Sequence, residues 1–125
     1  MRGYDRAFEP PAPVVDVTVL HPTVAGRRVA VRGKLDTGAD VTAIPEHIVA
    51  ELRLLPHGDT WIRGFDGAHF RRPVYYVRLL VEGTDLSSVR CIAAARRDVL
   101  LGRNVLNRFV ASLDGKNMTF EMRDP

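Results

Sequence analysis

The chain has 125 residues, of which 46% are hydrophobic and 26% are charged, and its net charge is +3. This length suits one compact domain, and the absence of any membrane-length apolar stretch or apolar N-terminal signal leads us to expect a soluble, cytoplasmic protein without a membrane partner. The arginines are scattered and the histidines lack ligand spacing, so we predict no nucleic-acid partner, no metal and no cofactor.

The first half of the chain predicts an arm, two strands and a helix. Three prolines fall within residues 1–13, which we interpret as a flexible, proline-rich N-terminal arm that avoids regular pairing. Alternating valines predict a strand over 14–20, and a second apolar alternation predicts a strand over 29–35 that ends directly before Asp36. A proline followed by apolar residues at helical spacing predicts a short helix over 46–52.

The second half of the chain predicts mainly strands. Apolar runs on both sides of Asp66-Gly67, a dipeptide suited to a tight turn, predict a protruding hairpin. We expect strands over 74–82, 86–94 and 99–101, one or two helical turns over 103–108, and a last hairpin made of 109–113 and 118–122. The single cysteine, Cys91, is predicted to be a buried structural thiol. These patterns predict one all-β domain over residues 14–122, followed by a tail over 123–125.

One segment has an arrangement that suits catalysis. Asp36 follows the strand over 29–35 and precedes Thr37 and Gly38, so its carboxylate lies at a strand end, on a turn that glycine permits. Backbone N–H groups around such a turn can donate to the ionised oxygens. A second carboxylate in contact with the first would make the pair share one proton, because like charges cannot both ionise at contact distance.

Two motifs resemble those of the retropepsin-like aspartic proteases, a family of retroviral proteases and small bacterial relatives. Residues 35–40, Leu-Asp-Thr-Gly-Ala-Asp, match the catalytic loop of that family, and residues 99–106, Val-Leu-Leu-Gly-Arg-Asn-Val-Leu, match its apolar-Gly-Arg-Asn segment. Between them, the hairpin over 62–68 occupies the place of the family's mobile flap. A lone Asp-Thr-Gly recurs by chance, but the two motifs in this order are specific. The likeness extends over about residues 14–122.

The resemblance implies a retropepsin-like closed barrel with one lobe per subunit, and it implies roles for the residues of the loop. Asp36 would be the catalytic carboxylate. Thr37 would hydrogen-bond across a two-fold axis, Gly38 would bring its backbone close to a bound peptide, and Ala39 would complete the active-site loop.

The resemblance also implies two supporting structures. Asp40 would form a structural ion pair with Arg103, which fixes the loop against the C-terminal helix, and a bidentate arginine–carboxylate contact is a usual way to hold a buried charge. The flap would close over the substrate, and its residues would be Arg63, Gly64, Phe65, Asp66 and Gly67.

The catalytic motif occurs once, so a chain of this length reaches two aspartates only by forming a two-fold symmetric dimer. We therefore predict an aspartic endopeptidase whose partners are a second copy of itself and a peptide or protein substrate. A water activated between the two Asp36 carboxylates would attack the scissile amide.

A second interpretation belongs to a different class of protein. The chain would be a catalytically idle dimeric domain of the same fold, which binds a peptide or holds an assembly together. Asp36 would then be a turn residue whose side chain caps its own backbone. The intact Asp-Thr-Gly-Ala-Asp sequence over 36–40 favours the enzyme.

Overall fold

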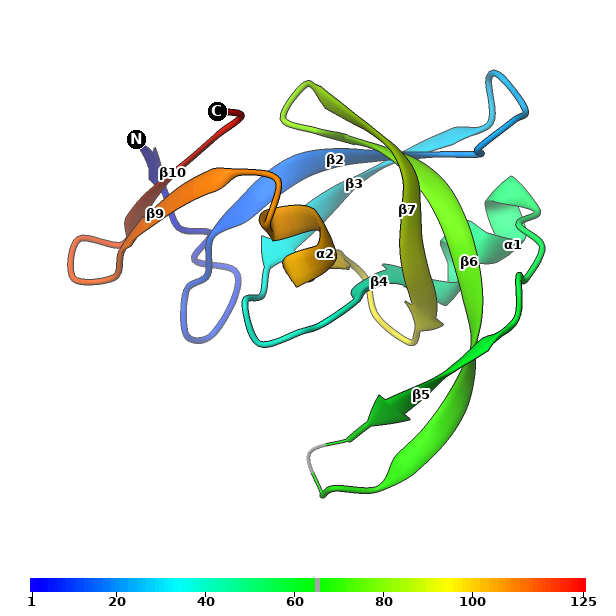
Figure 1. The fold of residues 1–125 in the computed structure, drawn as a ribbon. Coiled ribbons are helices and arrows are strands. Elements are labelled where there is room, and N and C mark those ends of the chain that lie inside the picture. Colours follow the sequence, from blue (N-terminus) through cyan, green and yellow to red (C-terminus); the bar gives the residue numbers. More distant parts are fainter. Residues whose placement is uncertain (65) are drawn as a thin grey trace.

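The computed structural model describes residues 1–64 and 66–125, and strands hold 52% of the residues (Figure 1). The larger sheet has the order β2-β3-β8-β4-β7-β6-β5. Its strands are β2 (Val14–Leu20), β3 (Arg28–Leu35), β4 (Thr42–Pro45), β5 (Asp59–Arg63), β6 (His69–Val81), β7 (Thr84–Ala94) and β8 (Val99–Leu101). A further pairing of β2 with β6 closes six of these strands into a barrel, while β5 stays outside. The predicted all-β class and closed barrel are confirmed.

The core fills the inside of this barrel. Val15, Val17 and Val19 of β2 are at most 2% exposed, because alternate residues of a strand face the same side of its sheet. Two short helices, α1 (Glu46–Leu52) and α2 (Arg103–Leu106), each add two buried side chains to the same core. Neither they nor any other helix within residues 1–64 and 66–125 has the length and apolar character needed to cross a membrane.

Three elements have the bounds that the sequence predicted, and one region differs clearly from its prediction. The three are the strands over 14–20 and 99–101 and the helix over 46–52. The separate apolar runs around Phe70 and over 74–82 are instead one continuous strand, β6. Pro73 lies inside it because this part of β6 pairs only with β5, so one side of the strand needs no N–H donor.

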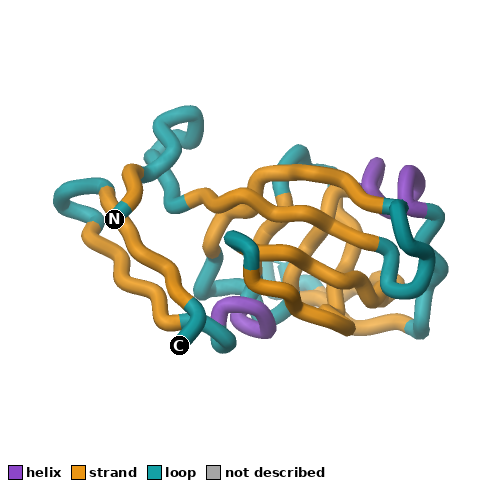
Figure 2. Tube along the Cα trace, turned by 90° about the horizontal axis from the view of Figure 1, so that it is seen from above, coloured by secondary structure: helices purple, strands orange, loops and turns teal. Residues whose placement is uncertain are grey.

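A smaller sheet lies beside the barrel and joins both ends of the chain (Figure 2). Its order is β1 (Arg2–Gly3), β10 (Thr119–Arg123) and β9 (Val110–Asp114). Phe120 of β10 is 1% exposed and belongs to the barrel core, and the ring of Tyr4 lies 6.1 Å from the Phe120 ring. Burial of Phe120 therefore anchors this sheet to the barrel.

The ends of the chain differ from the expectation in two respects. We expected no regular pairing within residues 1–13, but Arg2–Gly3 pairs with β10, because these residues precede the three prolines that block a ladder. Arg123, which we expected in the C-terminal tail, pairs with Val110 as the last residue of β10.

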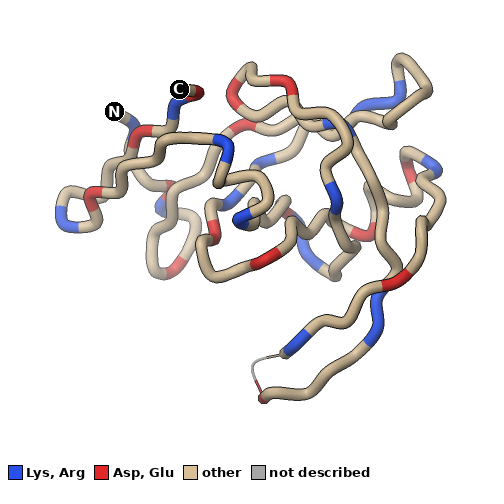
Figure 3. The backbone as a smooth tube through the Cα atoms, in the orientation of Figure 1, with Lys and Arg blue, Asp and Glu red and all other residues tan. Residues whose placement is uncertain are grey.

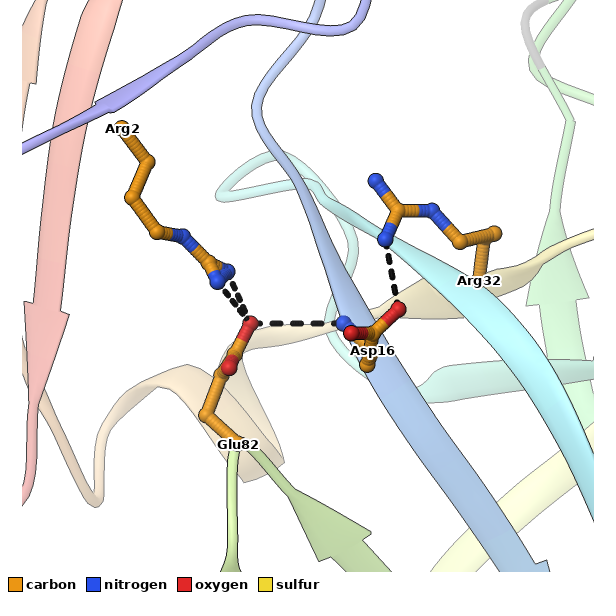
Figure 4. A network of polar contacts seen from close by, with 4 residues as sticks. All are labelled: Arg2, Asp16, Arg32 and Glu82. Carbon is orange, nitrogen blue, oxygen red and sulfur yellow. Dashed lines mark hydrogen bonds and ion pairs between the residues drawn. The ribbon is translucent and has the colours of Figure 1, made fainter.

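Polar contacts connect the N-terminal strand to the barrel surface (Figure 4). Arg2 forms an ion pair with Glu82, and Glu82 also accepts the backbone N–H of Asp16 at 3.3 Å. The carboxylate of Asp16 in turn accepts from Arg32 at 2.6 Å. Exposed ion pairs contribute up to about 1 kcal/mol each, so these contacts mainly orient β1. The burial of Phe120 on the neighbouring strand β10 holds the terminal sheet in place.

We predict that Phe120→Ala lowers the free energy of unfolding by about 3–5 kcal/mol, because a large ring leaves a cavity in the core. Phe70→Ala is the matched control, since Phe70 is 38% exposed and its removal should cost about 1 kcal/mol or less. Urea denaturation of the two variants measures the difference. Equal losses would show that the terminal sheet is not packed on the barrel core.

Candidate active site

The loop over 36–41 connects β3 to β4 and passes the end of β8, which lies between these two strands. β8 runs parallel to β3 and antiparallel to β4. Two backbone hydrogen bonds hold the loop: the N–H of Asp36 donates to the carbonyl of Leu101 at 3.0 Å, and the N–H of Arg103 donates to the carbonyl of Ala39 at 2.8 Å. The Gly-Arg-Asn segment therefore supports the Asp-Thr-Gly loop directly.

The side chain of Asp36 is half-buried and faces its own turn. Its Oδ1 accepts the backbone N–H of Gly38 at 2.9 Å, and a Cβ on Gly38 would lie 3.2 Å from that oxygen. Thr37 and Gly38 are exposed. In a single chain this bond caps the turn, an arrangement that suits both a catalytic carboxylate and an ordinary turn residue. The two roles differ in one respect: a catalytic carboxylate needs a second Asp36, from another copy of the chain, in contact with it.

Arg103 braces the loop through its side chain. It forms an ion pair with Asp40 and donates through Nη1 to the carbonyl oxygen of Thr37 at 3.0 Å. We expected a buried charge, but the Asp40 side chain is 84% exposed, because the loop lies at the surface of a single chain. Such an exposed pair adds up to about 1 kcal/mol, so it serves mainly to position the loop.

A buried hydroxyl connects the loop to helix α2. Thr42 is fully buried, and its Oγ1 donates to the Oδ1 of Asn104 at 2.8 Å and accepts the N–H of Gly102 at 3.2 Å. The same Oδ1 accepts the N–H of Thr42 at 3.1 Å, and the Nδ2 of Asn104 donates to the carbonyl of Arg90 at 2.8 Å. These bonds join three segments that are distant in sequence.

Gly102 permits this close approach. A Cβ at this position would lie 2.7 Å from the carbonyl carbon and oxygen of Val41, a separation that side chains do not tolerate. The glycine of the second motif is thus required because the backbone of the Asp-Thr-Gly loop packs against it.

We predict that Thr42→Val lowers the free energy of unfolding by about 1–3 kcal/mol, because the N–H of Gly102 and the Oδ1 of Asn104 lose a partner in a buried place. Thr42→Ser keeps the hydroxyl and should lose clearly less. Urea denaturation compares the two variants. A valine variant as stable as the serine variant would show that the hydroxyl bonds do not hold the loop.

A cleft of about 610 Å³ opens between the loop and the β5–β6 hairpin. Asp36 is not among its lining residues, although Gly38 and Ala39 are. The lining combines loop, sheet and hairpin residues: Gly38, Ala39, Asp40, Val41, Ala43, Thr60, Trp61, Ile62, Arg63, Arg90, Ile92, Leu100 and Asn104. The cleft therefore borders the candidate carboxylate and is large enough for side chains of a peptide.

The hairpin that the sequence predicted is formed by β5 and β6, whose pairing ends at Arg63 and His69. The N–H of Gly64 donates to the carbonyl of Ala68 at 2.9 Å, and Gly67 has a φ of +82°. The carboxylate of Asp66 accepts the N–H of Ala68 at 3.0 Å, which is the contact of a turn-forming residue. Phe65, which we assigned to the flap, lies outside the described residues.

Sequence reasoning missed one residue that holds the loop and several residues that line the cleft. Thr42 lies on β4, a strand of four buried residues that is too short to give a pattern. Trp61, Arg90 and Ile92 line the cleft from β5 and β7, and their proximity depends on sheet pairing that no local signal reveals. Trp61 is 63% exposed, and an exposed tryptophan is typical of a contact residue. Only the structure shows this exposure.

Two other expectations concern chemistry outside the loop. Cys91 is fully buried, as predicted, and burial raises the pKa of its thiol to about 12, so the thiol stays protonated and unreactive. Across residues 1–64 and 66–125, no three side chains of the metal-binding types gather into a group that would hold an ion.

A closed six-stranded barrel with an Asp-Thr-Gly loop braced by a Gly-Arg-Asn segment defines the class of retropepsin-like folds. The chain is similar to the simian foamy virus (mac) protease in solution, with 19% identity and a TM-score of 0.57, over 75% of this chain and 91% of that one. At this identity the likeness shows the fold alone.

Two larger foamy virus proteins contain a similar part. The protease-reverse transcriptase in complex with an RNA/DNA hybrid is 22% identical with a TM-score of 0.56, over 76% of this chain but 12% of that chain. The native prototype foamy virus protease-reverse transcriptase is 21% identical with a TM-score of 0.54, over 75% of this chain and 11% of that chain. The likeness is thus confined to a small part of each.

Residues 20–108 match the family model described as "gag-polyprotein putative aspartyl protease". The chain belongs to this family, as its two motifs predicted. Comparison with curated proteins gives no match. The matched residues include the loop, the hairpin and α2, whereas the sheet of β1, β9 and β10 falls outside them.

Proposed function

We propose that the protein is an aspartic endopeptidase that acts as a homodimer, with Asp36 of each copy forming the catalytic pair. The observation that carries this proposal is the Asp36 carboxylate on a braced loop beside a cleft of about 610 Å³. Membership of an aspartyl protease family supports peptide bonds as the target.

The chemistry follows from two carboxylates at contact distance. Two Asp36 side chains about 3 Å apart share one proton, because both cannot ionise there. The ionised one takes a proton from a water, the water oxygen attacks the scissile carbonyl, and the protonated one donates to the carbonyl oxygen. Protonation of the amide nitrogen then releases the two products. Thr37 would hydrogen-bond across the two-fold axis and keep the loops of the two copies in register.

The hairpin would act as a flap over the bound peptide. It extends away from the barrel in Figure 1, and Thr60, Trp61, Ile62 and Arg63 of β5 line the cleft. A peptide bound in extended form beneath Gly64 and Gly67 would be shielded from bulk water while the activated water reacts.

The edge strand β9 supports dimer formation. β9 has no neighbour on its outer side among the described residues, and Val110 and Leu113 are 40% and 52% exposed. Edge strands usually carry charges or prolines that prevent pairing, but Val110–Leu113 has neither. Antiparallel pairing of β9 with its copy would satisfy this edge, and parallel pairing would place Asp114 beside Asp114.

The apolar side of the terminal sheet also favours antiparallel pairing of β9 with its copy. Leu113 lies opposite Phe120, and Ala111 lies opposite Met122, so the apolar side of β10 continues onto β9 and ends at the open edge. A two-fold axis at Ser112 would place Ala111 beside Leu113 of the second copy and extend this layer.

We predict that Asp36→Asn lowers peptide hydrolysis on the order of 10³-fold or more, because an amide neither takes nor donates the shared proton. Cleavage of a mixed peptide library, followed by mass spectrometry over a range of pH, measures the effect. Asp16→Asn is the control, since Asp16 is exposed on β2 and is paired with Arg32. Equal cleavage by Asp36→Asn and the unmodified protein, or none by either, would favour the idle peptide-binding or assembly domain.

We predict that Leu113→Lys raises the dissociation constant of the dimer by roughly tenfold or more, because a symmetric interface carries the added charge twice. Sedimentation equilibrium measures the constant, with Val24→Lys as the control at a residue that is 38% exposed outside β9. An unchanged dimer would show that another surface joins the copies. A strictly monomeric protein that cleaves peptides would refute the Asp36 pair itself.

A further inference from the structure

Two arginines line the cleft from different strands. Arg63 and Trp61 come from β5, and Arg90 and Ile92 come from β7; in each pair the residues are two apart and share a side of their strand. Apolar residues, among them Ile62 and Leu100, complete the lining. The cleft therefore offers apolar contacts next to two guanidinium groups.

The charges of these arginines are not balanced by nearby acids in the described residues. Neither Arg63 nor Arg90 takes part in an ion pair within residues 1–64 and 66–125. The arginines that do are Arg2, Arg32, Arg71, Arg78 and Arg103. The acidic lining residue, Asp40, is bound by Arg103, and Asp66 is engaged by the N–H of Ala68. Figure 3 shows Lys and Arg segments on both strands of the hairpin.

Binding of a peptide would change the state of these two cations. In the open cleft both are exposed to water, so they are stable without partners. A peptide and a closed hairpin would remove part of that water, and an unpaired charge that loses water is unfavourable. A carboxylate on the peptide would offset this loss through charge-assisted hydrogen bonds to guanidinium. An amide of the same shape would offset less of it.

We infer that the cleft selects peptides that carry an acidic side chain close to an apolar one, with Arg63 and Arg90 as the residues that set this specificity. The inference rests on the proposed function in that it takes this cleft as the substrate site. It adds a substrate class, since apolar pockets alone would select for size and not for charge.

The test measures binding separately from cleavage. Fluorescein-labelled peptides with two central leucines carry Glu or Gln at each flanking position in turn, and fluorescence anisotropy gives their affinity for the Asp36→Asn protein, which does not consume them. We expect the best Glu peptide to bind roughly threefold to tenfold more tightly than its Gln counterpart, and the difference to shrink at high salt. The unmodified protein is assayed in parallel for kcat/KM on the same peptides.

Matched variants locate the effect. Arg63→Gln and Arg90→Gln should each reduce the preference for Glu, whereas Arg28→Gln, at an exposed arginine of β3, should leave it unchanged. Arg90→Glu should reverse the preference in favour of peptides with Lys at the same position, a rescue that a merely structural role of Arg90 would not give.

The outcomes separate the inference from the proposed function. Cleavage with equal affinity for Glu and Gln peptides overturns the inference and leaves the peptidase in place. A preference for Glu without cleavage by the unmodified protein upholds the inference and refutes the peptidase. Absence of both binding and cleavage refutes both.

Discussion

The geometry of the candidate site depends on the contact of the Asp-Thr-Gly loop with the Gly-Arg-Asn segment. Because β8 lies between β3 and β4, the loop must pass over the end of β8, and Gly102 leaves the space in which the backbone of Val41 fits. The buried hydroxyl of Thr42 then fixes the distance between the two segments. The position of Asp36 is therefore set by packing and buried hydrogen bonds. The exposed ion pair of Asp40 and Arg103 makes a smaller contribution to the position of the loop.

Much of the fold could be predicted because its signals are local. The valines of β2 alternate with polar residues, and helix α1 follows a proline, so each pattern stands within a few residues. β4 gave no such signal, because four buried residues form a strand only between partners that are far away in sequence. The continuity of β6 through Pro73 gave no local signal either, since the tolerance of a proline depends on which side of the strand is paired.

The residues of the candidate site also differ in whether a local sequence signal predicts them. A short motif marks Asp36 and its loop as candidates, and a second motif marks Arg103. The cleft residues Trp61 and Arg90 were not found, because each belongs to the lining only through the pairing of its strand and the reach of its side chain. Motifs thus locate the candidate carboxylate, whereas the lining of the cleft comes from three-dimensional proximity. This is the reason that a substrate class can be inferred from the structure and not from the motifs.

The proposed reaction and the proposed dimer contact involve different parts of the chain. The family match over 20–108 contains the loop, the cleft and the hairpin, and the sheet of β1, β9 and β10 lies beyond it. The proposed pair of Asp36 carboxylates would constrain the loop tightly, because a shared proton requires contact distance. An edge strand that joins two copies has a weaker requirement, namely an open ladder and an apolar side, which many sequences meet. In the proposed dimer, the loop and its supporting segment would therefore determine where the two carboxylates meet, whereas the terminal strands would only need to hold the two copies together.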